Sequence, residues 1–119
     1  MMADSNTTIE QLKKQVKDLI TERNWQQFHT PKSLAMAIAI EAAELMELFL
    51  WCENKATDIL EQKREHIEDE VADIAISLIN FCQKNNIDLS TAIERKIKKI
   101  AKKYPVEKSY GKPDKYTDL

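Results

Sequence analysis

Four carboxylates stand in two pairs of equal spacing in this 119-residue chain. Glu41 and Glu44 are three residues apart, and Glu70 and Asp73 repeat that separation further along. On a helix, side chains three residues apart lie on one face, about 4.5 Å apart along the axis. Two such helices side by side would form a four-carboxylate cage, which suits the hard cations Mg²⁺ or Mn²⁺. We therefore predict that all four residues are metal ligands.

The segment from Leu34 to Trp51 makes the first pair costly unless its charge is balanced. Its only non-apolar residues are Glu41, Glu44 and Glu47. A helix that is apolar nearly all round is expected to be buried on most sides, and a buried carboxylate needs a partner or a metal ion. A membrane span is excluded, because each carboxylate would cost roughly 2.5 to 3.5 kcal/mol in lipid. Glu47 has no matching acid and stays outside the predicted metal site.

Helical periodicity and capping signals predict the elements that must carry these acids. Four helices are expected. The first begins near Thr7 with a Thr7–Glu10 capping box, and the second begins at Pro31 after the N-cap Thr30 and ends near Trp51. The third runs from near Leu60 to Lys84, and the fourth begins after Asp88 or Ser90 and ends near Pro105. The core stripes are predicted to be Ile67, Val71, Ile74, Leu78 and Phe81 on the third helix, and Ile93, Ile97, Ile100 and Tyr104 on the fourth. The third helix also carries a polar stripe of His66, Glu70, Asp73 and Ser77.

Composition favours an all-α fold. Hydrophobic residues make up 43% of the chain and charged residues 32%. The chain has one glycine and three prolines, which is too few turn-forming residues for β-sandwiches, Rossmann loops or P-loops. We predict one domain over residues 1–119, a four-helix bundle, with residues 104–119 as a C-terminal loop. Cys52 and Cys82 belong to no metal-binding spacing and are expected to be reduced, mostly buried thiols.

Charge and apolar surface indicate the partners. The net charge of −2 conceals a strongly acidic stretch over residues 41–73 and a strongly basic one over 95–115. A pI near 5.7 argues against duplex nucleic acid, so the basic stretch fits small polyphosphates better. The first residues lack a signal peptide, which predicts a cytoplasmic protein. The second helix has more apolar surface than four short helices can cover, which predicts a homo-oligomer.

Several segments around the acids carry a resemblance to a known family. The acid pairs read EAAE and EVAD; ERNWQQFHTPKSL precedes the first, ELMELFLW continues from it, and KKYPVEKSYGKPDKYTDL ends the chain. In order and spacing these segments resemble the all-α nucleoside triphosphate pyrophosphohydrolases of the MazG-like superfamily, most closely the small dCTP pyrophosphatase-like branch. Di-iron bundles fit less well, because they require Glu-x-x-His pairs.

The resemblance implies hydrolysis of a (d)NTP between the α and β phosphates, giving a nucleoside monophosphate and pyrophosphate, and a house-cleaning role. It implies that Glu41, Glu44, Glu70 and Asp73 are catalytic, and that the protein is a homodimer or a homotetramer built from two dimers. The substrate-binding residues that it implies are Trp25, His29, Trp51, Lys96, Lys103, Tyr104, Lys115 and Tyr116. Of these, Trp25 and Trp51 would stack on the base. Lys96 and Lys103 would contact phosphate, and Tyr104 and the Lys115–Tyr116 tail would close over the site.

Two departures from the branch's pattern bear on the choice of base. Ile100 stands where an asparagine is expected, and Val16 stands where a histidine is expected. We therefore expect dCTP, or a broader set that includes dATP.

Other interpretations remain open for the residues taken alone. Each tryptophan could be a core residue, and His29 could be a capping or packing residue. The chain could be a non-enzymatic oligomerisation or regulatory module whose acids pair with lysines. It could also be a metal-dependent phosphatase or phosphodiesterase acting on another pyrophosphate bond.

Overall fold

A computed structural model describes residues 1–52 and 56–119, so that Glu53 and Lys55 of the acidic stretch lie outside the described residues. Every element in the described part is helical, in agreement with the predicted all-α fold. The elements are α1 (Ile9–Glu22), η1 (Trp25–Phe28), α2 (Pro31–Glu47), α3 (Ala56–Gln62), α4 (Arg64–Lys84), α5 (Leu89–Lys103), α6 (Val106–Ser109) and η2 (Tyr116–Asp118), where η marks a 3₁₀ helix. They form two compact units, residues 1–86 and 87–119, which are described separately.

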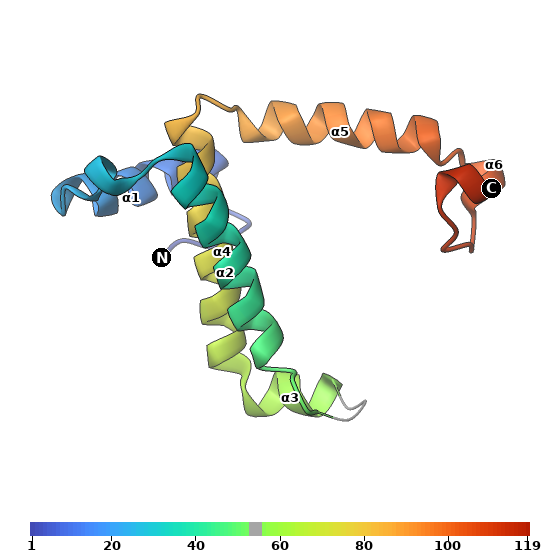
Figure 1. The fold of residues 1–119 in the computed structure, drawn as a ribbon, viewed down its shortest axis with the longest axis horizontal. Helices are drawn as coiled ribbons and strands as arrows, with labels where there is room; N and C mark the ends of the chain where they lie inside the picture. Colours follow the sequence, from blue (N-terminus) through green and yellow to red (C-terminus); the bar gives the residue numbers. More distant parts are fainter. Residues whose placement is uncertain (53–55) are drawn as a thin grey trace. The chain divides into compact units, whose positions relative to one another are not determined.

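An antiparallel pair of helices, α2 and α4, is the centre of the first unit. The two helices lie side by side along their length, and α3 leads from the end of one towards the start of the other (Figure 1). This pairing places the C-terminal half of α2, which carries the first acid pair, against the N-terminal half of α4, which carries the second.

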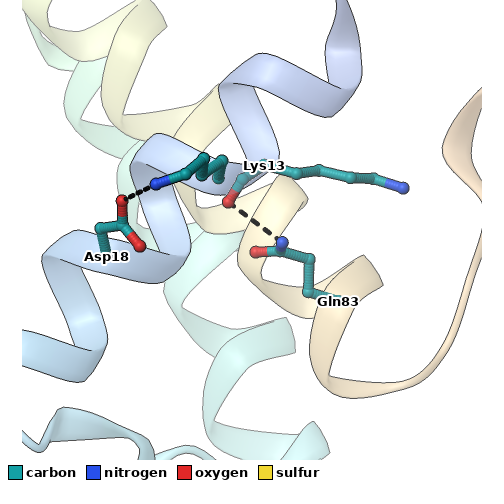
Figure 2. A network of polar contacts seen from close by, with 4 residues as sticks. Lys13, Asp18 and Gln83 are labelled. Atoms are coloured by element: carbon teal, nitrogen blue, oxygen red, sulfur yellow. Dashed lines mark hydrogen bonds and ion pairs between the residues drawn. The ribbon is translucent and has the colours of Figure 1, made fainter.

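The first helix packs across the C-terminal half of α4. Val16 and Ile20 form a buried cluster with Ile79. Close by, the side-chain amide of Gln83 donates a 3.0 Å hydrogen bond to the backbone carbonyl of Lys13 (Figure 2). Apolar packing and one polar tie therefore fix α1 on α4.

The start of α1 differs from the prediction by one residue. Thr8 is the N-cap: its hydroxyl accepts from the Gln11 backbone N–H at 3.2 Å, and the Gln11 side chain accepts from the Thr8 backbone N–H at 2.8 Å. The predicted Thr7–Glu10 capping box is wrong, because Gln11 fills the third helical position equally well and the Thr7 hydroxyl donates to Asn6 instead.

The starts of α2 and α5 agree with the prediction. The Thr30 hydroxyl accepts from the Ser33 backbone N–H at 3.1 Å, with Pro31 in the first turn. The Asp88 carboxylate accepts from the Thr91 backbone N–H at 2.9 Å, which resolves the start of α5 in favour of Asp88. Both caps satisfy a backbone N–H that would otherwise lack an intrahelical acceptor.

Three element ends differ from the prediction. α2 stops at Glu47 rather than near Trp51. The predicted helix over residues 60–84 is divided at Lys63, whose φ of −118° and ψ of 26° interrupt the helix between α3 and α4. The C-terminal segment is not wholly a loop, because it contains α6 and η2.

Burial along α2 and α4 is lower than predicted. Only Leu34 of α2 is buried, whereas Met36 and Met46 are more than half exposed. On α4, Ile67 of the predicted core stripe is buried but Val71 is half-exposed. The reason is geometric: α4 covers one side of α2, and a helix that is apolar all round needs further partners.

The second unit consists of α5 and the segment that follows it. No residue of α5 is buried, and its predicted core residues Ile93, Ile97 and Ile100 are 49%, 60% and 46% exposed. Tyr116 of the C-terminal segment packs edge-on against Tyr104 at the end of α5, with ring centroids 5.9 Å apart. The apolar stripe of α5 is therefore a face rather than a core.

The two thiols have different environments. Cys82 on α4 is buried as predicted, but Cys52 is exposed because α2 has already ended before it. In the described residues, no helix combines the length and the apolar character that a membrane crossing requires. The cytoplasmic location stays a prediction.

Candidate metal centre

Three of the four predicted ligands come together between α2 and α4. Carboxylate oxygens of Glu41, Glu44 and Glu70 lie within 4.8 Å of one another. Glu41 and Glu44 are one turn apart on α2, and Glu70 faces them from α4 because the two helices run antiparallel in contact. Such a group of converging oxygens is what a hard divalent cation requires.

Two oxygens at this point are buried without a hydrogen-bond donor. They are Oε2 of Glu41 and Oε2 of Glu70, and the described residues offer neither of them a partner. Burial raises the pKa of Glu41, and the neighbouring carboxylate of Glu44 raises it further. Burial likewise raises the pKa of Glu70, again with Glu44 as a contributor. The protein alone thus leaves negative charge at this place uncompensated.

Asp73 lies next to the cluster but outside its closest group. Its negative charge contributes to the raised pKa of both Glu41 and Glu70. It is exposed, and its oxygens are not among those that lie within 4.8 Å of one another. The structure therefore places the fourth predicted ligand beside the three without bringing it into the same close group.

The donor set fits a divalent metal ion. The converging ligands are all carboxylate oxygens, and two of them lack any other partner. The ion pairs that the structure shows among the described residues are Lys14–Asp18, Glu22–Arg23, Arg64–Glu68 and Glu94–Lys98, none of which involves the cluster. Pairing of these acids with lysines, as a non-enzymatic module would require, is thus not seen in the described residues.

The predicted base-binding residues Trp25 and His29 lie in the connection between α1 and α2. Trp25 begins η1, is 46% exposed and lies under the guanidinium of Arg23, 5.7 Å from its ring centroid. His29 is half-buried, and its Nδ1 is 3.1 Å from the amide nitrogen of Asn80 on α4. Sequence reasoning missed Asn80, because no local signal links residues 51 positions apart.

The other predicted base-stacking residue, Trp51, lies beyond the opposite end of α2. The 17 residues of α2 span about 25 Å, and Trp25 precedes this helix while Trp51 follows it. Trp51 is 92% exposed and has a left-handed φ of 63°. The structure does not bring the two rings together within one chain.

The predicted phosphate-binding residues lie in the second unit. Lys103 holds its ammonium nitrogen 4.8 Å from the ring centroid of Tyr116, which also contacts Tyr104. Lys96 lies on the same helix about 10 Å before Lys103, and Lys115 directly precedes η2. The structure therefore joins Lys103, Tyr104 and Tyr116 into one small group at the end of α5.

Comparisons with known proteins agree with this architecture. A family profile described as "MazG-like family" matches residues 36–119. The dCTP pyrophosphatase 1 of Bos taurus is 33% identical over 118 residues, covering 97% of this chain and 70% of that protein. The Homo sapiens protein of the same name is 30% identical over 115 residues, covering 94% and 68%.

A solved structure shows the same fold. It is described as a pyrophosphatase from Archaeoglobus fulgidus DSM 4304, and it superposes with a TM-score of 0.79 at 34% identity over 88% of this chain and 99% of that chain. The chain therefore belongs to the MazG-like family and, within it, to the dCTP pyrophosphatase-like branch of nucleoside triphosphate pyrophosphohydrolases.

Proposed function

We propose that the protein hydrolyses (d)NTPs between the α and β phosphates, giving (d)NMP and pyrophosphate, with Mg²⁺ bound by its carboxylates and Mn²⁺ as a possible substitute. The observation that carries this proposal is the group formed by Glu41, Glu44 and Glu70, in which two buried oxygens have no hydrogen-bond donor. In the metal-free protein a proton shared with Glu44 reduces that cost, whereas a metal ion removes it with all three carboxylates ionised.

In this proposal the protein's carboxylates hold the metal ion and orient the attacking water. Glu41, Glu44 and Glu70 hold the ion, with Asp73 as the fourth ligand. A bound divalent ion supplies charge neutralisation at the phosphates and acidifies a bound water. One of these glutamates also orients that water by accepting its hydrogen bond.

The remaining predicted residues are proposed to hold the nucleotide. Lys96 and Lys103 contact the triphosphate, and Tyr104 with the Lys115–Tyr116 tail closes over it. The packing of Tyr116 on Tyr104 and the position of Lys103 over its ring support a common role for the end of α5 and the C-terminal segment.

Base recognition is proposed to rest on stacking. Trp25 and Trp51 provide aromatic faces, and His29 follows Trp25 by four residues. Stacking favours any base, and Val16 and Ile100 replace two polar residues of the related branch. We therefore propose dCTP, dATP or both as preferred substrates in nucleotide-pool house-cleaning.

The proposed assembly is a homodimer or a homotetramer of two dimers, each chain being one catalytic domain over residues 1–119. Trp25 and Trp51 lie beyond opposite ends of α2, so two chains are needed to place both against one base. The exposed isoleucines of α5 and the exposed apolar residues of α2 offer surface for that contact.

The catalytic proposal is tested by pyrophosphate release from a panel of (d)NTPs, with Mg²⁺ or with EDTA. Glu44→Ala should lower the rate by at least about a hundredfold, because even residues behind metal ligands cost 10–100-fold in metal affinity or activity. Glu47→Ala is the matched control, since Glu47 is an exposed glutamate three residues further along α2, outside the cluster. Equal rates for the two variants, or release of orthophosphate instead of pyrophosphate, would contradict the proposal.

The assembly is tested by light scattering coupled to size exclusion. Ile97→Glu places a charge in the apolar stripe of α5 and should convert the oligomer to smaller species. Lys98→Glu introduces the same side chain at the adjacent, largely exposed position and should leave the mass unchanged. A wild type that is monomeric at micromolar concentration refutes the assembly.

A further inference from the structure

The connection between α1 and α2, residues 24–30, is held mostly by bonds within itself. Gln27 donates from its side chain to the Asn24 carbonyl at 3.0 Å, and the His29 backbone N–H donates to the Gln26 carbonyl at 3.1 Å. Asn24 adopts a left-handed φ of 52°, which turns the chain out of α1. The start of the connection is also tied to α1, because the Asn24 backbone N–H donates to the Thr21 carbonyl at 3.0 Å and the Arg23 guanidinium lies 5.7 Å from the Trp25 ring centroid. These bonds leave the end of the connection, towards His29, to be placed by another contact.

Among the described residues, one side-chain hydrogen bond ties this connection to a distant helix. The amide nitrogen of Asn80 on α4 lies 3.1 Å from His29 Nδ1, in a partly buried position. With the amide nitrogen donating, His29 Nδ1 is the acceptor. The bond therefore fixes both the place and the orientation of the imidazole.

Asn80 stands in register with the carboxylates on the same helix. It follows Asp73 by seven residues, two turns, which is about 10 Å along α4 on the same face. A nucleotide with its α-phosphate at the carboxylates extends its base over a distance of this order. The His29–Asn80 bond thus lies within the reach of a nucleotide whose phosphates are at the carboxylates.

We propose that Asn80 is a positioning residue: through its bond to His29 it anchors the Trp25–Phe28 segment beside α4, so that Trp25 is ready to stack on the base. This inference rests on the proposed function for its kinetic consequences, but its structural part concerns Trp25 alone. Asn80 touches neither phosphate nor metal ligand, so its loss should weaken substrate binding and spare the chemical step.

The chain offers a matched control on the same helix. Gln83 is a second carboxamide of α4, also half-buried, and it too makes one hydrogen bond to another element, the 3.0 Å bond to the Lys13 carbonyl (Figure 2). Gln83→Ala removes a comparable tie to α1 and leaves the 24–30 connection untouched. A merely structural role for Asn80 predicts the same behaviour for both variants.

The first readout is the separation of KM from kcat for pyrophosphate release. A single hydrogen bond corresponds to a change of about three- to tenfold. Asn80→Ala should raise KM by that factor with kcat nearly unchanged, and Gln83→Ala should leave KM at the wild-type value. His29→Ala combined with Asn80→Ala should be no worse than the worse single variant, because the two residues act as one unit. The proposal would be overturned if the two single changes in KM multiplied in the double variant, or if KM were unchanged in Asn80→Ala.

The second readout requires no activity. Because the chain has two tryptophans, Trp51→Phe leaves Trp25 as the single emitter. In that background Asn80→Ala should increase acrylamide quenching by up to about twofold, since Trp25 is 46% exposed and can become fully so, while Gln83→Ala should not. Equal quenching in both variants refutes the positioning role. If the wild type releases no pyrophosphate, the proposed function fails, and the quenching result still decides on Asn80.

Discussion

Replacing Glu41 by glutamine should stabilise the metal-free protein and destabilise the metal-loaded one relative to wild type. Glu41 is half-buried, its Oε2 has no donor among the described residues, and the carboxylates of Glu44 and Glu70 lie nearby. Glutamine keeps the shape, removes one negative charge and brings two N–H donors. These can donate to the oxygens of Glu44 or Glu70, including the buried oxygen of Glu70 that now lacks a partner.

The size of the effect follows from one new hydrogen bond. Such a bond contributes about 1 kcal/mol net, which for a domain of this length raises Tm by about 4 °C. Saturation with Mg²⁺ at a hundred times its Kd should stabilise the wild type by about 2.7 kcal/mol, or about 10 °C. The variant has lost a ligand and should gain little, so the order of the two melting temperatures reverses.

The assay is thermal unfolding followed by circular dichroism, with EDTA and with saturating Mg²⁺. Glu47→Gln is the control, because this glutamate lies on the same helix outside the cluster. It should change neither melting temperature. The reasoning is refuted if Glu41→Gln melts below wild type in EDTA, or if both proteins gain equally from Mg²⁺.

Two further predictions concern pH and packing. Folding raises the pKa of Glu41 above its unfolded value, mainly by burial. The free energy of unfolding of the metal-free protein should therefore fall as pH rises from the ordinary glutamate pKa through the raised one. Urea titrations at several pH values should show a smaller dependence of this free energy on pH in Glu41→Gln. Ile79→Ala, which empties part of the cluster that binds α1 to α4, should cost about 2–4 kcal/mol in urea denaturation. Val71→Ala on the half-exposed face of α4 should cost less than half as much, and a similar loss in both would contradict the assigned core.

Capping chemistry explains which parts of the fold could be predicted. Thr30 before Pro31, and Asp88 before α5, are local signals read within four residues, and both helix starts follow them. The interruption at Lys63 has no such signal, since the surrounding residues are good helix formers without glycine or proline. It arises where the chain leaves α3 and joins the antiparallel pair, which is a tertiary requirement.

Burial could not be predicted from periodicity alone. The isoleucine stripe of α5 is amphipathic as expected, yet Ile97 is 60% exposed. An apolar stripe indicates a helix face that is expected to pack against another apolar surface, but the pattern does not show whether that surface belongs to the same chain.

The candidate site was accessible to sequence reasoning only in part. The two acid pairs could be placed together because spacing of three residues puts each pair on one helix face, and antiparallel helices bring such faces into contact. The tie between His29 and Asn80 depends on how a non-helical connection folds back over α4, and no periodic signal reports that. The catalytic and binding roles stay predictions until the variants are measured.

The left-handed backbone at Trp51 restricts which substitutions can be interpreted at that position. A non-glycine residue in this region carries a conformational cost of about 1–2 kcal/mol. Trp51→Gly would remove this cost together with the ring, so a scan could register a more stable protein with weaker nucleotide binding from a single change. Trp51→Phe keeps the backbone cost nearly constant and isolates the ring. For protein engineering, position 51 is thus a site where stability and ligand affinity are opposed. Selection for thermal resistance should favour glycine or asparagine there, and the aromatic ring that stacks on the base would then be lost.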